Sequence, residues 1–261
     1  MKQIDAEQET GKIIAFIKQS FQSAGFSDVV IGLSGGVDST VSCILATRAL
    51  GLEHVYPILL PYGPLNTRGV LDAMELIEKL KLPMSHVVRI DMQPAVDAIV
   101  RIDPFMNRIR KGNIMARVRM TYLFDQAKKR NALVMGTENK SEHLLGYFTR
   151  FGDEASDVEP ILHMYKTQVF VLAKYLEVPQ TILNKAPSAD LWPEQTDEGE
   201  LGFTYEEADE VLYLANDEHK SKAEIIKSGL GEIQVNAIFQ RIDKNKFKIL
   251  TDHGIKFFGM S

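Results

Sequence analysis

The sequence predicts an α/β fold, a doubly wound parallel sheet with helices on both faces. Short apolar segments of strand length alternate with longer segments that have the periodicity of amphipathic helices. A helix separates each predicted strand from the next, which implies right-handed crossovers and a parallel sheet. With 261 residues, 45% apolar and 25% charged, the composition is that of an ordinary globular protein. We expect a single domain over residues 1–261.

The first half of the chain contains most of the predicted strands. An amphipathic helix is expected over residues 5–24, where Ile13 and Ile17 mark the buried side. The apolar run 29–33 then predicts a buried strand. The elements expected next are helix 39–51, strand 54–60, helix 68–82, strand 86–90 and a short helix 94–102.

The second half is mainly helical. Asn113 is expected to cap a long helix that runs to about Lys129, and residues 132–136 predict a further strand. Helices are expected over residues 165–177, 204–215, 220–228 and 231–242. Segment 184–202 has neither periodicity and contains several acidic residues, so it is either a binding lid or a solvated surface loop.

Composition excludes several classes of protein. The net charge of −5 argues against a nucleic-acid partner. One cysteine, Cys43, leaves no internal disulfide and no cysteine-based zinc site, and its apolar neighbours predict a core residue. No apolar run reaches the ~18 residues of a membrane span, and the N-terminus lacks the apolar core of a signal peptide. We therefore expect a cytoplasmic protein without membrane partners.

The segment Ser34-Gly35-Gly36-Val37-Asp38-Ser39-Thr40 lies between strand 29–33 and helix 39–51. A glycine-rich turn at a helix N-terminus is a phosphate cradle, because backbone N–H groups and hydroxyls can approach the phosphate oxygens. The segment lacks the lysine of the common P-loop and carries an aspartate instead. Since a carboxylate beside phosphates requires a cation between them, Asp38 indicates bound Mg²⁺.

This cradle resembles the signature of the N-type ATP pyrophosphatases, a superfamily with an adenine nucleotide alpha hydrolase-like fold. The resemblance implies cleavage of ATP between its α and β phosphates and release of AMP after an adenylated intermediate. The cradle alone does not choose among members such as GMP synthetases and tRNA-modifying enzymes.

Further segments select one branch of the superfamily. Together they resemble the ammonia-dependent NAD synthetases, and the resemblance runs from Ile31 to Tyr205. The segments that carry it are Gly136 to Glu142, Gly146-Tyr147-Phe148-Thr149-Arg150-Phe151-Gly152-Asp153, Lys185 to Trp192 and Gln195 to Gly202. The reaction implied is ATP-dependent amidation of deamido-NAD with ammonia.

The resemblance also implies site residues. ATP is the co-substrate, and the residues expected to bind it are Ser34, Gly35, Gly36, Val37, Asp38, Ser39, Thr40, Arg117, Thr137, Lys166 and Ser188. Mg²⁺ is expected at Asp38 and Glu142. The residues expected to bind deamido-NAD and ammonia are Arg117, Tyr147, Phe148, Thr149, Arg150 and Asp153. The expected catalytic residues are Asp38, Asp153 and Lys166, and the expected assembly is a homodimer whose interface includes the long helix after Asn113.

The chain departs from the family pattern near the acyl and ammonia sites. Glu154-Ala155 stands where the family usually has two glycines, and the C-terminal basic motif is replaced by Asn245-Lys246-Phe247-Lys248 and residues 254–258. We expect the loop at Ala155 to follow a different path, because alanine adopts positive φ only with strain. Two alternatives stay open: a related enzyme that amidates another carboxylate, and a non-catalytic nucleotide-binding module.

Overall fold

The computed structural model describes residues 3–249, and its centre is a parallel sheet. Strands β1 (Asp28–Gly32), β2 (Val55–Leu59), β3 (Val88–Arg89) and β4 (Ala132–Met135) lie in the order β3-β2-β1-β4. The chain adds β2 and β3 on one side of β1 and returns to place β4 on the other. The loops after β1 and β4 therefore meet where the strand order reverses, which is the usual ligand site of such sheets.

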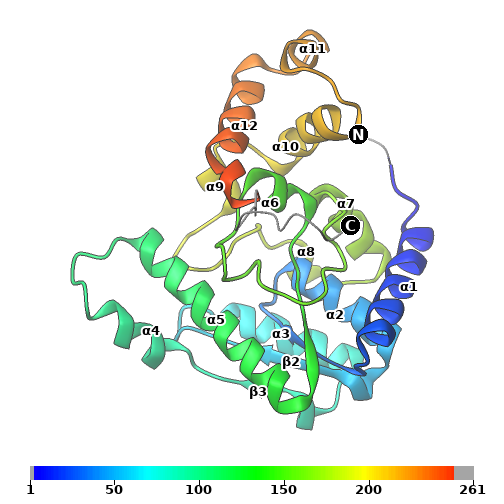
Figure 1. Cartoon of the computed structure of the whole chain (residues 1–261), viewed down its shortest axis with the longest axis vertical. Helices are drawn as coiled ribbons and strands as arrows, with labels where there is room; N and C mark the ends of the chain where they lie inside the picture. The colour runs from blue at the N-terminus through cyan, green and yellow to red at the C-terminus, as the bar shows by residue number, and fades with distance from the viewer. Residues whose placement is uncertain (1–2, 250–261) are drawn as a thin grey trace, which may run out of the picture.

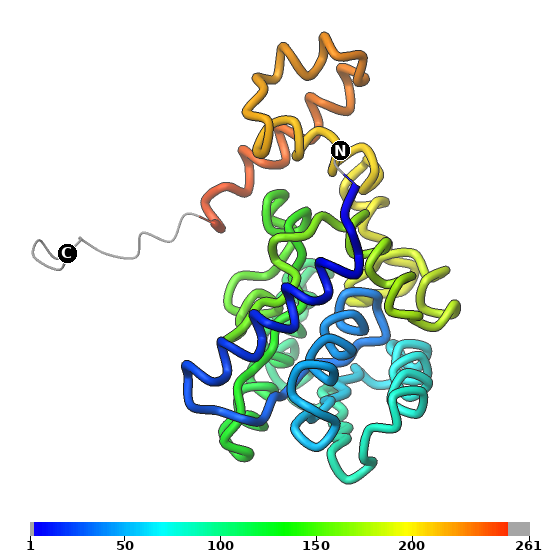
Figure 2. Tube along the Cα trace, turned by 90° about the vertical axis from the view of Figure 1, so that its right-hand side faces the viewer, coloured from blue at the N-terminus to red at the C-terminus, as the bar shows by residue number. Residues whose placement is uncertain are grey.

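Helices cover both faces of the sheet (Figure 1). On one face, α1 (Ala6–Ala24), α2 (Val37–Leu50), α3 (Thr67–Leu80) and α7 (Lys166–Tyr175) share a core with the strands. Figure 2 shows α1 alongside α2 on this face. The long helix α5 (Arg108–Arg130) covers the opposite face, where Ala127 packs near Val30 and Val134. Helix α4 (Gln93–Val100) packs against α5.

The last described residues form what we call the C-terminal helical unit, residues 203–249. It contains α10 (Tyr205–Leu212), a π-helical turn Tyr213–Asp217, α11 (Lys222–Lys227), α12 (Glu232–Asn245) and a 3₁₀ turn Lys246–Lys248. Figure 1 shows these helices gathered at one end of the molecule, away from the sheet. They have their own apolar cluster, into which Leu145 and Tyr165 of the main body insert.

The predicted cap of the long helix is wrong. Helix α5 begins at Arg108, and the side chain of Asn107 caps it by accepting a hydrogen bond of 3.0 Å from the N–H of Arg110. The added first turn is polar and basic, so apolar periodicity does not reveal it. Asn113 lies inside the helix, where its Oδ1 accepts a hydrogen bond from the hydroxyl of Thr149.

Three short helices were not expected from the sequence. They are α6 (Lys140–Leu145), α8 (Gln180–Leu183) and α9 (Asp197–Leu201). Each is too short to show a helical period. The last of them lies in segment 184–202, which shows neither helical nor strand periodicity, and the hydroxyl of Thr196 caps it by accepting from the N–H of Gly199.

Cys43 is a core residue, as predicted. Its side chain is fully buried in α2, and burial raises the pKa of the thiol to about 12. Among residues 3–249, no helix is both long enough and apolar enough to cross a membrane.

Candidate functional site

Two glycines position the loop between β1 and α2. Gly35 has a φ of +75°, and a Cβ at this position would lie 2.3 Å from the carbonyl oxygen of Gly69 in α3. A Cβ on Gly69 would in turn lie 2.4 Å from the carbonyl oxygen of Ser34. Any side chain at either position would force the loop and α3 apart. The sequence reasoning identified Gly35 but missed its partner Gly69.

Hydroxyl groups shape the same loop from within. The hydroxyls of Ser34 and Ser39 lie 3.0 Å apart, and the N–H of Gly36 donates to Ser34 Oγ over 3.2 Å. Gly36 is the N-cap of α2 and provides no side-chain acceptor, which leaves the helix N-terminus able to receive an anion. The geometry therefore agrees with the predicted phosphate cradle.

Two of the predicted ATP-binding residues lie on the core side of the cradle. Val37 and Thr40 are buried in α2, and the Thr40 hydroxyl has no hydrogen-bond partner within residues 3–249. Ser34, in contrast, is exposed at the mouth of the loop. Ser34 and Asp38 are the less buried side chains of the cradle, and the hydroxyl of Ser39, although buried, lies beside that of Ser34.

The amino group of Lys166 bridges two carboxylates at the N-terminus of α2. Its Nζ lies 2.6 Å from Asp38 Oδ2 and 3.0 Å from Glu142 Oε1. The amide of Asn139 donates to the other Asp38 oxygen, Oδ1, over 3.0 Å. Helices α2, α6 and α7 thus converge on one point. The predicted residues Asp38, Glu142 and Lys166 are brought together, although 128 positions separate Lys166 from Asp38.

Burial and charge shift the titration of this group. Burial opposes the charge on Lys166, but the carboxylates of Asp38, Glu142 and Asp197 outweigh it and hold the lysine pKa above its ordinary value. Burial raises the pKa of Glu142 to about 8, with Asp38 and Asp197 adding to the rise and Lys166 opposing it. The single ammonium of Lys166 faces three carboxyl groups, those of Asp38, Glu142 and Asp197, so their charge can balance a further cation.

The residues present fit a magnesium ion that is shared with a nucleotide. In the part of the chain that the structure describes, no group of three or more His, Cys, Asp or Glu side chains is arranged to hold a metal. Mg²⁺ typically takes only one or two carboxylates and completes its shell with water and substrate phosphates. Asp38 and Glu142 meet this need, because both contact the same cationic nitrogen beside the cradle.

Thr137 and Ser188, two further predicted ATP ligands, come from other loops. Thr137 is half-buried in the loop after β4. Ser188 forms a turn in which its Oγ accepts from the N–H of Asp190 over 3.0 Å. Segment 184–202 also bridges α3 and α5, because Asn66 donates to the Asp190 carbonyl over 2.9 Å and Arg108 stacks over Trp192.

The residues predicted for the acyl and ammonia side lie against α5. The N–H of Thr149 donates to Asp153 Oδ1 over 2.9 Å, and its hydroxyl donates to Asn113 Oδ1 over 3.0 Å. Arg117 Nε donates to the carbonyl oxygen of Arg150 over 3.3 Å. Asp153 itself is exposed. We call residues 149–155 the acyl-side loop.

Tyr147 and Phe148 connect this loop to α9 and α6. The hydroxyl of Tyr147 donates to Asp197 over 3.1 Å, and the ring of Phe148 stacks on His143. The C-terminal helical unit supports both residues, because Lys248 Nζ donates to the carbonyl oxygens of Gly146 and Phe148 over 2.6 and 2.7 Å. Lys248 therefore provides a basic contact despite the altered C-terminal motif. Residues 254–258 lie outside the described residues.

The structure explains how the chain accommodates Glu154-Ala155. The residue with positive φ in this loop is Phe151, at 57°, and not Ala155. The carboxylate of Glu154 stabilises that turn by accepting from the N–H of Phe151 over 2.9 Å. Glu154 is thus a structural part of the loop as well as a charge beside Asp153.

Three residues to which the sequence assigned no role make contacts at the site. Asn139 orients Asp38, and its capping box with Glu142 is a local pattern that could have revealed it. Asp197 receives hydroxyl hydrogen bonds from Tyr147 and Tyr205 beside Lys166. Burial lowers the pKa of Arg119, and the charges of Asp153 and Asp190 partly offset this. Nothing in the sequence places Asp197 or Arg119 near these partners.

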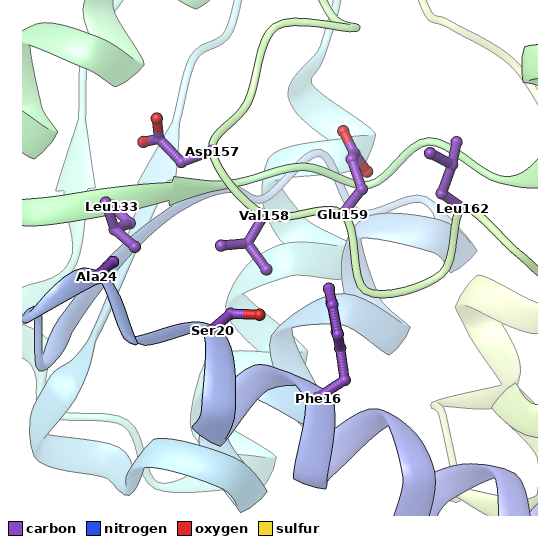
Figure 3. A pocket seen from close by; sticks show the side chains of 8 residues that line it. All are labelled: Phe16, Ser20, Ala24, Leu133, Asp157, Val158, Glu159 and Leu162. Carbon is purple, nitrogen blue, oxygen red and sulfur yellow. The ribbon is translucent and has the colours of Figure 1, made fainter. Parts of the chain in front are cut away.

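Two surface grooves lie away from these residues. Figure 3 shows the first, of about 500 Å³, where Phe16, Ser20 and Ala24 of α1 face Leu133 of β4 and the Val158–Leu162 segment. The second, of about 640 Å³, lies along α4 and the residues that follow it. Neither contains a predicted site residue, so the cradle remains the candidate site.

A cradle at the switch point of a parallel sheet, with carboxylates in place of a P-loop lysine, defines a class of nucleotide-binding α/β proteins. Comparison with known proteins narrows this class. The chain belongs to the NAD synthase family, whose model matches residues 9–251.

Individual relatives agree with this assignment. An NH3-dependent NAD⁺ synthetase of Chlorobium phaeobacteroides is 43% identical over 233 residues, which are 89% of this chain and 83% of the relative. The NMN synthetase structure from Francisella tularensis has 35% identity and a TM-score of 0.85, and the match covers 97% of this chain and 100% of that one. The NH3-dependent NAD synthetase structure from Campylobacter jejuni has 31% identity, a TM-score of 0.82 and the same coverage. These neighbours confirm the predicted fold.

Proposed function

We propose that the chain converts deamido-NAD to NAD with ammonia and ATP, and releases AMP and pyrophosphate. The observation that carries this proposal is the Lys166 bridge between Asp38 and Glu142 at the N-terminus of α2. It places one strong cation and two potential metal ligands beside a loop shaped for phosphate. Membership of the NAD synthase family supports the choice of carboxylate.

The reaction requires activation of a poor acylating group. A carboxylate oxygen of the substrate attacks the α phosphorus of ATP, the α–β bridging bond breaks, and pyrophosphate leaves. The resulting acyl-adenylate has AMP as a good leaving group. Ammonia then attacks the acyl carbon, the bond to the AMP oxygen breaks, and a proton is lost from nitrogen as the amide forms.

The residues around the cradle and the Lys166 bridge, which we call the ATP-side residues, carry out the adenylation step. Ser34, Gly36 and Ser39 hold the pyrophosphate portion through N–H and hydroxyl groups, and Lys166 offsets charge that develops as the α–β bond breaks. Asp38 and Glu142 would hold Mg²⁺, which supplies further charge neutralisation when bound. Arg117, Thr137 and Ser188 complete the set that we assign to ATP.

The acyl-side loop performs the second step. Ammonia at neutral pH is mostly ammonium, so an exposed carboxylate can both attract it and take up its proton. Asp153 has this exposure, and the N–H of Thr149 fixes its orientation. We assign Tyr147, Phe148, Thr149 and Arg150 to binding of deamido-NAD.

We further propose that the enzyme is a homodimer and acts in the cytoplasm. Apolar side chains at the junction of α4 and α5 support the dimer, because Ile102, Phe105 and Ile109 are 83%, 94% and 60% exposed in the single chain. A cluster of this kind is typical of an interface. Light scattering should report a dimer, and Phe105→Asp should shift it toward monomer. A wild-type monomer that makes NAD would contradict this part of the proposal.

A second candidate substrate is the mononucleotide. The Francisella tularensis neighbour is an NMN synthetase, which points to amidation of nicotinate mononucleotide by the same chemistry. The test is incubation of the chain with ATP, Mg²⁺, ammonium and either acid, with the amide, AMP and pyrophosphate measured. We expect deamido-NAD to be preferred. Preference for the mononucleotide would support the second candidate, and no amide from either would contradict both.

A further inference from the structure

Two aspartates of the C-terminal helical unit contact the elements that carry the ATP-side residues. Asp209 in α10 is completely buried. One of its oxygens accepts the hydroxyl of Ser141, and the other accepts both the N–H and the hydroxyl of Thr167, over 2.8 and 2.7 Å. Ser141 lies in α6 and Thr167 in the first turn of α7. One carboxylate therefore joins three helices.

The neighbours of these contacts belong to the candidate site. Ser141 precedes Glu142, and Thr167 follows Lys166. The Ser141 hydroxyl oxygen also accepts from the backbone N–H of Lys166 over 2.8 Å. The first N–H groups of a helix have no partner within the helix. In α7 those of Lys166 and Thr167 are satisfied by Ser141 and Asp209, which fixes where the helix begins relative to α6.

Asp217 makes a parallel but more exposed connection. Lys140 contacts both of its oxygens over 2.8 Å, and the hydroxyl of Tyr165 donates to it. These partners also adjoin the site, on the other side of Ser141 and Lys166. The side chains of Lys140 and Asp217 are 23% and 37% exposed, so water screens their interaction.

We propose that Asp209 is a positioning residue that sets the distance between Glu142 and Lys166, and hence the geometry of the phosphate and metal site. The inference rests on the proposed function for its kinetic consequence. Asp209 does not itself touch the substrate. It acts through Ser141 and Thr167, and a displacement of about 1 Å at reacting groups can cost about 100-fold in rate.

The arrangement requires a carboxylate rather than an amide. Both Asp209 oxygens act only as acceptors, and together they receive three hydrogens from Ser141 and Thr167. In Asp209→Asn one oxygen becomes an NH₂ group, which either faces the N–H donor of Thr167 or makes the Ser141 hydroxyl turn to accept, so that one of the three hydrogens loses its acceptor. Since an unsatisfied buried polar group is costly, α6 and α7 should shift to relieve it.

The main experiment compares Asp209→Asn with two control variants. Asp217→Asn changes the exposed connection, and Val211→Ala weakens the packing of α10 but removes none of the hydrogen bonds to Ser141 or Thr167. The measurements are kcat and KM for deamido-NAD, the affinity for ATP by calorimetry with and without Mg²⁺, and the melting temperature. The assay temperature is kept well below all melting transitions.

We expect Asp209→Asn to lower kcat by about 10- to 100-fold with KM for deamido-NAD little changed. The gain in ATP affinity that Mg²⁺ provides should also shrink. Val211→Ala should lower the melting temperature while kcat stays at the wild-type value, and Asp217→Asn should change kcat less than threefold. Wild-type kcat and Mg²⁺-dependent ATP affinity in Asp209→Asn would overturn the proposal.

A second pair of variants applies if Asp209→Asn does not fold. Thr167→Val removes the hydroxyl with little change in volume, whereas Thr167→Ser keeps it. A loss of kcat in the valine variant that serine restores supports the proposal, and equal rates in both overturn it. If the wild-type chain makes no amide, the proposed function fails, while Mg²⁺-dependent ATP affinity in Asp209→Asn still decides the role of Asp209.

Discussion

The ATP-side residues and the acyl-side loop differ sharply in how they are built. Lys166 is 2% exposed, and its partners Asp38 and Glu142 come from two other helices. In the acyl-side loop, Asp153 is exposed and Phe151 is 56% exposed. The first half of the candidate site thus brings together side chains from three helices of one chain. The second is open, and we expect the substrate and a second copy of the chain to cover it.

This difference predicts that the two half-reactions can be separated by mutation. Exchange of labelled pyrophosphate into ATP, in the presence of deamido-NAD, reports adenylation alone. Formation of NAD reports both steps. A residue of the ATP side should affect both measurements, and Asp153, which we assign to ammonia, should affect only the second.

The largest effect is expected for Asp38→Asn. It removes a charge from the Lys166 bridge and one ligand proposed for Mg²⁺, so pyrophosphate exchange and NAD formation should both fall by about 10²–10³-fold. Asp28→Asn is a matched control, because Asp28 pairs with His54 at the far end of β1. Normal exchange in Asp38→Asn would remove this residue from the site.

A somewhat smaller effect is expected for Asp153→Asn. General acid–base groups contribute at least about 10²-fold, so NAD formation should fall by about that factor while pyrophosphate exchange continues. Parallel loss of exchange would show that the two halves of the site are not separable. Replacing Glu154-Ala155 with Gly-Gly removes the contact to Phe151 and should change the Michaelis constants more than the reaction catalysed.

Gly35→Ala tests the packing that shapes the cradle. The added Cβ would meet the Gly69 carbonyl at a backbone φ of +75°, and such strain costs about 1–3 kcal/mol. We expect a lower melting temperature and weaker ATP binding. Gly11→Ala is the control, since it has open space in α1 and should stabilise the protein by about 0.5–1 kcal/mol. Unchanged ATP affinity in Gly35→Ala would contradict the role given to the loop.

The smallest effect is expected for Asn66→Ala, which removes the hydrogen bond to the Asp190 carbonyl in segment 184–202, together with those that Asn66 Oδ1 accepts from the N–H of Tyr62 and from Arg119. A hydrogen bond of this kind contributes about 0.5–1.5 kcal/mol, so KM for ATP should rise a few-fold. Without ATP, a protease should cleave the segment faster in the variant than in the wild type. Adding ATP should slow this cleavage. If ATP does not change the rate of cleavage in either the wild type or the variant, the segment is an ordinary surface loop.

Local sequence was sufficient to predict the cradle, but not to predict which distant residues surround it. The strand, the Ser34–Thr40 loop and α2 are consecutive, so their pattern predicts both the fold and the phosphate site. Lys166 was found through family resemblance, and Glu142 through its position after a predicted strand, not through periodicity. Asp209 reaches Ser141 across 68 positions, and only the folding of α10 onto α6 reveals the contact. The cap at Asn107 was missed because the first turn of α5 has a single apolar residue, Ile109, and so shows no apolar periodicity.

The most direct test of the account follows one oxygen atom. Deamido-NAD labelled with ¹⁸O in its nicotinate carboxylate is incubated with the chain, ATP, Mg²⁺ and ammonium, and the products are analysed by mass spectrometry. Attack of the carboxylate on the α phosphorus predicts one ¹⁸O atom in each AMP formed and none in pyrophosphate. Label in inorganic phosphate together with ADP, or AMP that carries no label, would contradict the acyl-adenylate and the function built on it.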